Sequence, residues 1–212
     1  MKKTLKILSV ILFLLSANHM NGQVFSGGVE TGFSASQIDG DCRGGYYKLG
    51  FNGGIFADMK TGKKSFLRSG IYLIDKGAHS GPKDLYYKIQ ISEVEVPLWY
   101  EYDLSPKLGF AGGLSAAYIY KAYYDAGTYI PKDQLNISNW DYTFFISLRM
   151  KIYKNLYFRL SNSYGIVPIT RPITFDCWRQ SVYLGWLYPS PYCDCWWTNT
   201  MRVTLEIKLS KK

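Results

Sequence analysis

The stretch that decides the fold is Met201-Arg-Val-Thr-Leu-Glu-Ile-Lys-Leu209, in which apolar and polar side chains alternate without a break. A period of two is that of a β-strand, because successive side chains of a strand point to opposite faces. One face of this segment is wholly apolar, and the other carries two basic residues, a threonine and a glutamate. The pattern predicts a strand over residues 197–209 with one apolar and one charged face.

Seven further segments alternate in the same way, so the chain as a whole predicts an all-β fold. They cover residues 24–35, 46–59, 65–74, 87–102, 107–121, 140–153 and 156–165. The 20 glycines and the aromatic content of 17% fit strands joined by many turns. A chain of 212 residues has room for one barrel or sandwich domain. We therefore expect eight antiparallel strands in an up-and-down barrel.

The fourth segment breaks its own alternation. Ile89 and Ile91 have the opposite parity to Val94 and Val96. An extra residue in a strand changes the side-chain parity beyond it, so a β-bulge at 92–93 would return all four aliphatic residues to one face. We predict a bulge at this point.

The connections between the segments alternate between long and short. The long ones are residues 36–44, 75–86, 122–139 and 166–196, and the short ones are 60–64, 103–106 and 154–155. Outer-membrane barrels have short periplasmic turns and long extracellular loops. The connections therefore predict a transmembrane barrel, and the even strand count places both termini in the periplasm.

Aromatic residues gather at the ends of the predicted strands, where membrane barrels carry two aromatic belts at the lipid headgroups. Those beside the short connections are Phe66, Trp99, Tyr100, Tyr102, Phe110, Tyr153 and Tyr157. Those beside the long connections are Tyr46, Tyr47, Tyr86, Tyr87, Tyr118, Tyr120, Trp140 and Tyr142. We expect both sets to face lipid.

Residues 1–22 have the pattern of a secretory signal peptide. Lys2, Lys3 and Lys6 precede an apolar run from Ile7 to Leu15, which is too short to span a bilayer. We expect cleavage before Gln23, export, and a barrel domain over residues 23–212. The net charge of +9 falls to +6 without the three leader lysines. An exported basic protein meets anionic lipid headgroups and lipopolysaccharide phosphates rather than nucleic acid.

The polar face of the segments is rich in Gly and Ser and carries charges of both signs, as the crowded lumen of a small barrel requires. The charged residues are Glu30, Lys48, Arg68, Glu93, Glu95, Glu101, Arg149, Arg159, Arg202, Glu206 and Lys208. Unpaired charges in a lumen would be costly, so we predict networks of Arg–Glu pairs. A soluble periplasmic barrel that binds a small apolar ligand is the alternative, with its apolar face turned inward.

Five motifs resemble the PorT-like outer-membrane β-barrel family of Bacteroidota-type bacteria. They are Gly28-Val-Glu-Thr-Gly32, Gly45-Tyr-Tyr-Lys-Leu-Gly-Phe-Asn-Gly-Gly54, Gly70-Ile-Tyr-Leu-Ile-Asp-Lys-Gly77, Val94-Glu-Val-Pro-Leu98 and Gly109-Phe-Ala-Gly-Gly113. Their order and spacing cover somewhat less than half of the chain. The resemblance implies an eight-stranded outer-membrane barrel with no defined active site. Some relatives take part in protein secretion or gliding.

Four cysteines lie in connections expected outside the cell, where disulfides persist: Cys42, Cys177, Cys193 and Cys195. Four cysteines allow two disulfides in three pairings. Cys42 can reach the last loop, because the first and last strands of a closed barrel are neighbours. Free thiols and a metal site are alternatives, although Cys193-Asp-Cys195 has no nearby histidine ligands.

The last loop is also rich in tryptophan and predicts a surface for an envelope protein or glycan. Its tryptophans are Trp178, Trp186, Trp196 and Trp197. Packing over the barrel mouth explains them equally well. Together these features favour a non-enzymatic outer-membrane scaffold or interaction module, which needs no cofactor.

The sequence allows two enzymatic interpretations. His79 and Ser80 could serve a lipid-A-modifying acyl hydrolase, which needs a histidine aimed at a serine. Glu93, Glu95 and Glu101 could be paired carboxylates for glycoside hydrolysis, but lumen salt bridges explain them better. The chain has no Gly-x-Ser-x-Gly elbow, P-loop or dinucleotide fingerprint.

Overall fold

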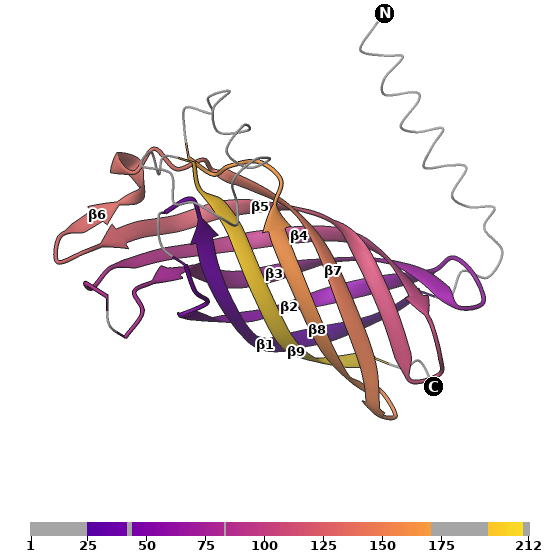
Figure 1. Cartoon of the computed structure of the whole chain (residues 1–212). Coiled ribbons are helices and arrows are strands. Elements are labelled where there is room, and N and C mark those ends of the chain that lie inside the picture. The colour runs from indigo at the N-terminus through magenta and orange to yellow at the C-terminus, as the bar shows by residue number, and fades with distance from the viewer. Residues whose placement is uncertain (1–24, 42–43, 83, 171–194, 210–212) are drawn as a thin grey trace, which may run out of the picture.

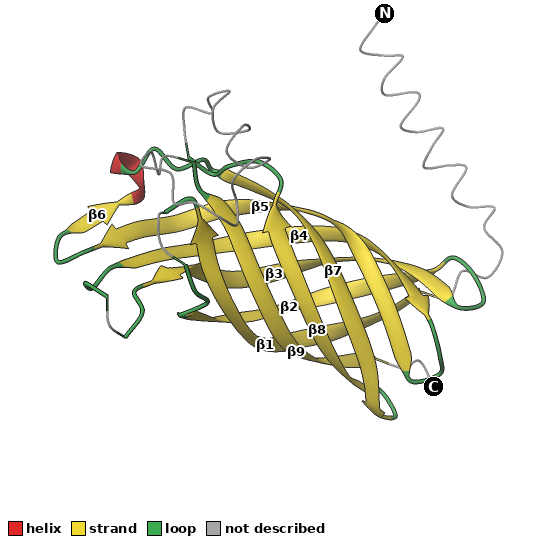
Figure 2. Ribbon diagram, in the orientation of Figure 1, coloured by secondary structure: helices red, strands yellow, loops and turns green. Residues whose placement is uncertain are grey.

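The computed structural model describes residues 25–41, 44–82, 84–170 and 195–209, and these form one barrel (Figure 1). Its eight long strands are β1 (Phe25–Asp39), β2 (Lys48–Lys60), β3 (Ser65–His79), β4 (Lys88–Asp103), β5 (Leu108–Asp125), β7 (Trp140–Tyr153), β8 (Leu156–Gly165) and β9 (Trp197–Leu209). Figure 2 shows that strands dominate the described chain. The described residues include no helix long and apolar enough to cross a bilayer.

Each long strand pairs antiparallel with the next one, and β9 returns to pair with β1 from Gly27–Leu209 to Asp39–Trp197. The sheet is therefore closed, and the eight-stranded up-and-down barrel is confirmed. One strand was not predicted: β6 (Tyr129–Pro131) folds back on the end of β5 and is followed by the 3-10 turn η2 (Lys132–Gln134).

All short connections lie at one end of the barrel and all long ones at the other, as expected. The short ones are residues 61–64, 104–107 and 154–155, and the long ones are 40–47, 80–87, 126–139 and 166–196. Strand β3 runs five residues beyond its predicted end, to His79. This extension could not be predicted, because residues 75–79 contain Asp75, Lys76 and Gly77 and lack the alternation of apolar and polar residues that indicates a strand.

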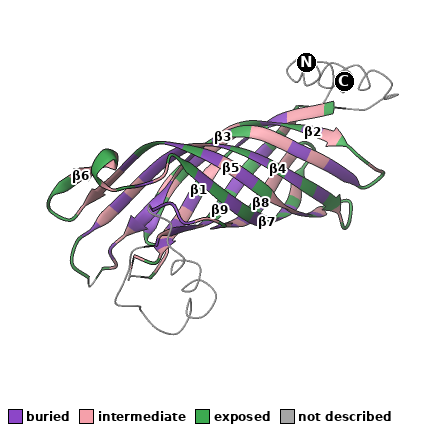
Figure 3. Cartoon of the chain, turned by 90° about the horizontal axis from the view of Figure 1, so that it is seen from above, coloured by how far each residue is buried: buried purple, intermediate pink, exposed green. Residues whose placement is uncertain are grey.

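Buried and exposed residues alternate along the strands (Figure 3), and the exposed ones include the apolar residues, so the apolar face points outward. Leu49 is 73% exposed, Phe144 46% and Val203 45%, whereas Arg149 is 6% and Arg202 5% exposed. A soluble barrel would bury the first three and solvate the last two, because it gains stability by removing apolar area from water. A soluble periplasmic barrel requires an apolar face that points inward, so this alternative is wrong.

The register shift in β4 lies where it was predicted, but the extra residue lies in the other strand. Ser92 pairs with Lys121 and Glu93 with Ile119, so Tyr120 has no partner and the bulge is in β5. Ile89 and Ile91 consequently stay on the inner face, where both are buried. The prediction that a bulge moves them to the lipid face is wrong.

These isoleucines belong to an apolar cluster inside the long-loop end of the barrel. Its members are Ile38, Ala78, Tyr87, Ile89, Ile91, Ile119, Ala122, Ile137 and Ile169. The interior of the barrel is thus apolar near the long loops, whereas the rest of it combines charged side chains with a second apolar cluster. The prediction that the apolar residues of each strand face lipid is therefore wrong at this end of the barrel.

The aromatic belts are only partly as predicted. Outward-facing rings near the short turns are Tyr100, Tyr102, Phe110 and Tyr153, and those near the long loops are Tyr118, Tyr120, Trp140 and Tyr142. Phe66, Trp99 and Tyr87 were expected in the belts but are buried inside. Phe66 and Trp99 are in phase with the inward residues of β3 and β4, and Tyr87, directly before β4, continues the inward phase of Ile89.

One glycine near the long-loop end gives a test of the barrel geometry. Gly77 has a φ of 142°, and a β-carbon built on it would overlap the carbonyl oxygen of Ile89 on β4. We expect Gly77→Ala to lower the free energy of unfolding by about 1–3 kcal/mol, because the backbone conformation is strained for any L side chain. Urea unfolding of the refolded protein in micelles measures this.

Gly112 is the matched control. A β-carbon there would meet no atom closer than 3.8 Å, so Gly112→Ala should change stability by less than about 0.5 kcal/mol. Equal losses from both variants would contradict the assigned geometry of β3 and β4.

Candidate functional site: the charged lumen

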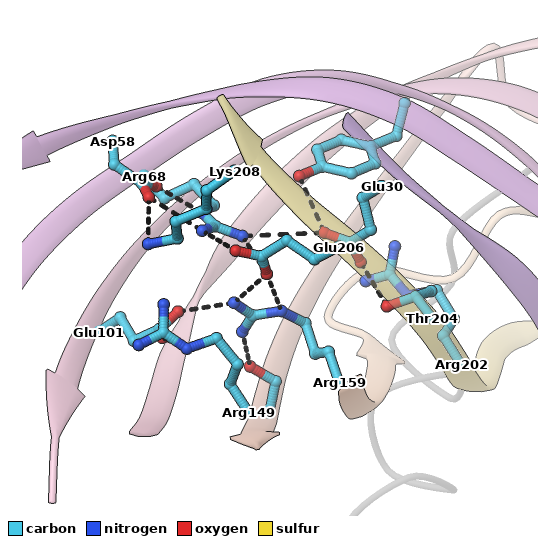
Figure 4. A network of polar contacts seen from close by, with 12 residues as sticks. Glu30, Asp58, Arg68, Glu101, Arg149, Arg159, Arg202, Thr204, Glu206 and Lys208 are labelled. Carbon is cyan, nitrogen blue, oxygen red and sulfur yellow. Dashed lines mark hydrogen bonds and ion pairs between the residues drawn. The ribbon is translucent and has the colours of Figure 1, made fainter. Parts of the chain in front are cut away.

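The lumen near the short-turn end is centred on Arg68 of β3, whose side chain is fully buried. Its Nε lies 2.5 Å from Asp58 Oδ1, its Nη2 lies 2.6 Å from Glu206 Oε1, and its Nη1 lies 3.8 Å from Glu30 Oε2. The guanidinium carbon also lies 3.7 Å from the centroid of the Phe56 ring. One arginine thus pairs with carboxylates from three strands (Figure 4).

Two further arginines close the network from the opposite wall. Arg159 Nη2 lies 2.8 Å from Glu101 Oε2 and 2.9 Å from Glu206 Oε2. Arg149 contacts Glu101 at 2.9 Å and Asp103 at 2.6 Å. Glu206 is therefore shared by Arg68 and Arg159, and it links the two walls of the lumen.

Like charges face each other on adjacent strands of this network. Glu30 is directly opposite Glu206 across β1 and β9, and Arg149 is directly opposite Arg159 across β7 and β8. Such pairs are destabilising when nothing compensates them. The compensating charges come from strands outside each pair, and the contacts of Arg68 with Glu206 and of Arg159 with Glu101 cross the lumen.

Aromatic rings form a layer around the middle of the lumen. Trp99 packs edge-on against Phe145, with centroids 4.8 Å apart, and Arg159 lies 4.9 Å above the Trp99 ring. Rings and guanidinium groups attract one another most strongly where water is excluded. These contacts hold the arginines in place between their carboxylates.

Two further charged groups complete this middle layer. Arg202 Nη1 donates to Glu95 Oε1 at 3.0 Å. Glu30 accepts from the hydroxyl groups of Thr204 at 2.7 Å and Tyr72 at 3.3 Å. Each buried carboxylate therefore has a partner, as buried charge requires.

Nearer the long loops, Lys76 bridges two carboxylates. Its Nζ lies 2.6 Å from Glu93 Oε1 and 2.6 Å from Asp141 Oδ2, and Thr198 Oγ1 donates to the same Asp141 oxygen at 2.7 Å. These four residues come from β3, β4, β7 and β9. The apolar cluster of the long-loop end lies on the far side of this bridge from the arginines.

The structure brings most of the sequence-predicted lumen charges together. Glu30, Arg68, Glu93, Glu95, Glu101, Arg149, Arg159, Arg202, Glu206 and Lys208 all take part in ion pairs. Lys48 is the exception, since its Nζ donates to the backbone oxygen of Leu49 at 2.6 Å. The contacts of Glu93, Glu95 and Glu101 with basic side chains fit a structural role.

Sequence reasoning missed Asp58, Lys76 and Asp141. The parity of the second segment could have found Asp58, because that residue is in phase with Asn52 and Gly54. No comparable signal marked Lys76, which fell in a predicted loop. Asp141 follows directly on Trp140 at the predicted start of a strand, where a polar residue is also common in a turn.

The four cysteines and the tryptophans of the last loop lie mostly outside the described residues. Cys42, Cys177, Cys193, Trp178 and Trp186 all do. Cys195 is buried and does not carry a free thiol. Trp197 is buried beside it, and Trp196 packs against the apolar cluster. These two tryptophans therefore belong to the interior, which corrects their expected place on an exposed contact surface.

His79 and Ser80 do not form the histidine–serine pair that the hydrolase interpretation requires. Its Nδ1 lies 2.8 Å from the backbone oxygen of Ser80, not from the serine hydroxyl. The ring packs edge-on against Tyr86 with centroids 5.8 Å apart. A nucleophilic serine needs a histidine in contact with its hydroxyl, and this geometry does not supply one.

A closed antiparallel barrel with an apolar exterior and an ion-paired interior defines an outer-membrane β-barrel protein. The family assignment agrees: the chain belongs to the family of the outer membrane protein beta-barrel domain, whose model matches residues 19–171. No match was found among curated protein sequences.

Several solved structures have a similar fold at 10% sequence identity. Ail, the attachment invasion locus protein of Yersinia pestis, has a TM-score of 0.49 over 87% of this chain and 99% of that protein. Neisserial surface protein A has a TM-score of 0.46 over 89% and 100%. OprG from Pseudomonas aeruginosa has a TM-score of 0.39 over 89% and 98%.

Removing the central arginine tests the network. Arg68→Met leaves the carboxylates of Asp58, Glu206 and Glu30 buried without their shared cation, so we expect a loss of about 3–5 kcal/mol in the free energy of unfolding. Lys63→Met, in the exposed 61–64 turn, should change it by less than about 0.5 kcal/mol. Urea unfolding in micelles would contradict the network if the two variants behaved alike.

Proposed function

We propose that this protein is a non-enzymatic outer-membrane scaffold whose long-loop end contacts another component of the cell envelope. The closed lumen carries the proposal. Arg68 on β3 pairs with Glu206 on β9, and Arg159 on β8 pairs with Glu101 on β4. None of these pairs joins neighbouring strands, so each one spans the lumen.

A solute that crossed such a lumen would have to separate several buried ion pairs. Breaking one buried pair costs about 3–5 kcal/mol, and the pairs here share partners, so they would have to open together. A permanent open path for large solutes is therefore disfavoured. The function then falls to the ends of the barrel.

The long-loop end offers more contact surface than the short-turn end. Leu85 is 83% exposed, and Tyr47, Tyr86 and Tyr129 are each more than half exposed. Tyrosines are enriched at recognition surfaces, and exposed apolar patches often mark them. Outside the cell, such a surface would face the envelope or a neighbouring protein.

Export and the narrower family assignment belong to the same proposal. Residues 1–22 support a cleaved signal peptide, which the mass of the mature protein tests by locating the new N-terminus at Gln23. The five Gly-rich motifs support a PorT-like barrel with a link to secretion. Deleting the gene and measuring secreted proteins tests that link.

We also propose that Cys42 forms a disulfide with a cysteine of the last loop. Gly40 supports this pairing, because a β-carbon built on it would overlap the carbonyl oxygen of Cys195. The backbone two residues before Cys42 therefore touches that loop. Peptide mapping without reduction tests the pairing.

Site-specific photo-crosslinking tests the contact surface. We expect Leu85→p-benzoylphenylalanine to yield one discrete crosslinked product in intact cells, because this position projects from the long-loop end. Leu104, which is 54% exposed in a short turn, is the control and should not yield that product. The same product from both positions, or none from Leu85, would contradict the proposal.

A further inference from the structure

Strands β2 and β3 are not paired with each other near the long loops. Their ladder ends at the pair of Asn52 and Ile74, whereas β2 stays paired with β1, and β3 with β4, up to the end of each strand. Residues 48–51 of β2 and 75–79 of β3 therefore line an unpaired stretch of the barrel wall. We call this stretch the β2–β3 seam.

Two serines of β1 hold the β3 side of the seam. Ser34 Oγ donates to the carbonyl oxygen of Asp75 at 2.7 Å, and Ser36 Oγ accepts from the Gly77 N–H at 2.9 Å. Gly50 of β2 makes room for this contact, because a β-carbon there would lie 2.1 Å from the same Asp75 oxygen. The serines thus reach past β2 and put side-chain hydrogen bonds where a ladder would otherwise continue.

Lys48 holds the β2 side of the seam. It is buried and forms no ion pair with any residue that the structure describes, but its Nζ donates to the carbonyl oxygen of Leu49 at 2.6 Å. The register of the ladder, when continued, places Leu49 opposite Gly77, whose N–H is bound to Ser36 instead. Because an unpaired backbone group is costly beside hydrocarbon, we infer that the ammonium group replaces the missing donor.

The seam separates two apolar environments. On the inside, Ala78 of β3 and Ile38 of β1 belong to the apolar cluster of the long-loop end. On the outside, Leu49 and Phe51 are 73% and 55% exposed in the lipid-facing row of β2. A molecule at the seam therefore meets apolar side chains on both sides of the wall.

The bridge of Lys76 closes the apolar cluster toward the rest of the lumen. Lys76 lies in the unpaired part of β3, and its Nζ contacts Glu93 and Asp141 at 2.6 Å each. This charged layer separates the cluster from the arginine network. A molecule that reached the cluster through the seam would not have to part the ion pairs of that network.

We propose that the β2–β3 seam opens sideways and admits a small apolar molecule from the membrane to the apolar cluster of the long-loop end. Opening requires Ser34, Ser36 and Lys48 to release their backbone partners, whereas opening elsewhere in the wall would break a strand ladder. The apolar class follows from the two environments that the seam joins, since a polar molecule would lose its hydration there without gaining a partner. This lateral route goes beyond the scaffold role proposed above.

Hydrogen exchange tests whether the seam opens. In the protein refolded in micelles, the amides of Leu49 and Phe51 should exchange at least about ten-fold faster than those of Ala35 and Met201. The last two are matched controls, because they pair with each other in the β1–β9 ladder near the same end of the barrel. Seam amides that exchange no faster than these controls would overturn the proposal.

Two variants of Lys48 test what holds the seam closed. K48M removes the donor to Leu49 and should speed exchange at Leu49 and Phe51 by about a further ten-fold, which is the effect of losing one hydrogen bond from a charged group. K48R keeps a charged donor and should exchange like the unmodified protein. Equal exchange in K48M and K48R would show that Lys48 does not hold the seam.

An apolar photoreactive probe tests the passage. The probe 3-(trifluoromethyl)-3-(m-iodophenyl)diazirine partitions into lipid; it is activated in vesicles that contain the refolded protein, and mass spectrometry locates the label. We expect label on Ile89 and Ile91 inside the long-loop end, several-fold more in K48M and unchanged in K48R. Equal labelling in K48M and the unmodified protein would assign entry to another route and overturn the seam, as would no label on either isoleucine.

Two other positions control for access and for general loosening. Leu205 faces outward and should be labelled alike in every variant. Phe145 is buried in the second apolar cluster, beyond the Lys76 bridge, and should stay unlabelled. Label on Phe145 equal to that on Ile89 would indicate a loosened barrel and overturn the seam. Crosslinking at Leu85 does not depend on Lys48, so this proposal and the scaffold role can fail separately.

Discussion

The structure depends on the pairing of charges across the lumen. Glu30 and Glu206 are adjacent on one wall, and Arg149 and Arg159 are adjacent on another. Neither pair of like charges is tolerable by itself in a buried space, and the ion pairs that these four residues form are all with residues outside their own pair of strands. Arg68, Glu101 and the shared Glu206 join the two walls. The closed barrel is thus the arrangement in which every one of these charges meets its opposite.

This pairing gives the inner and outer faces of the barrel different roles. Because charges are satisfied inside, the outer face is free to consist of leucine, isoleucine, valine and aromatic residues that favour lipid. Closure also leaves no strand edge, which hydrocarbon would penalise. The same pairing fills the lumen, so we expect contacts with other molecules at the loops and at the lipid-facing rim. The bulge in β5 interrupts the apolar outer face, because it turns Tyr120 and Lys121 to the outside together.

The fold was predictable because period-two alternation survives in every long strand, and the loop lengths then fix the two ends. The lumen was predictable where charge and parity coincide, as for Arg68, Arg159 and Glu206. It was not predictable near the long loops, where the interior is apolar and Ile89 looks like a lipid-facing residue. The prediction for Trp99 was also wrong, because this apolar ring lies inside the lumen and not in the outer belt. The sequence indicates a change of side-chain parity in the segment that forms β4. It does not indicate which of the two paired strands carries the extra residue. That residue is Tyr120 in β5.

The most direct test of the central claim measures what surrounds the outward side chains. A nitroxide attached at Leu205 through p-acetylphenylalanine, in protein reconstituted in lipid vesicles, reports collisions with oxygen and with a water-soluble nickel chelate. Our account predicts frequent collisions with oxygen and few with nickel at Leu205, and the reverse at Leu85 in the long-loop end. Nickel access at Leu205 equal to that at Leu85 would show that this face meets water, and the account would be wrong.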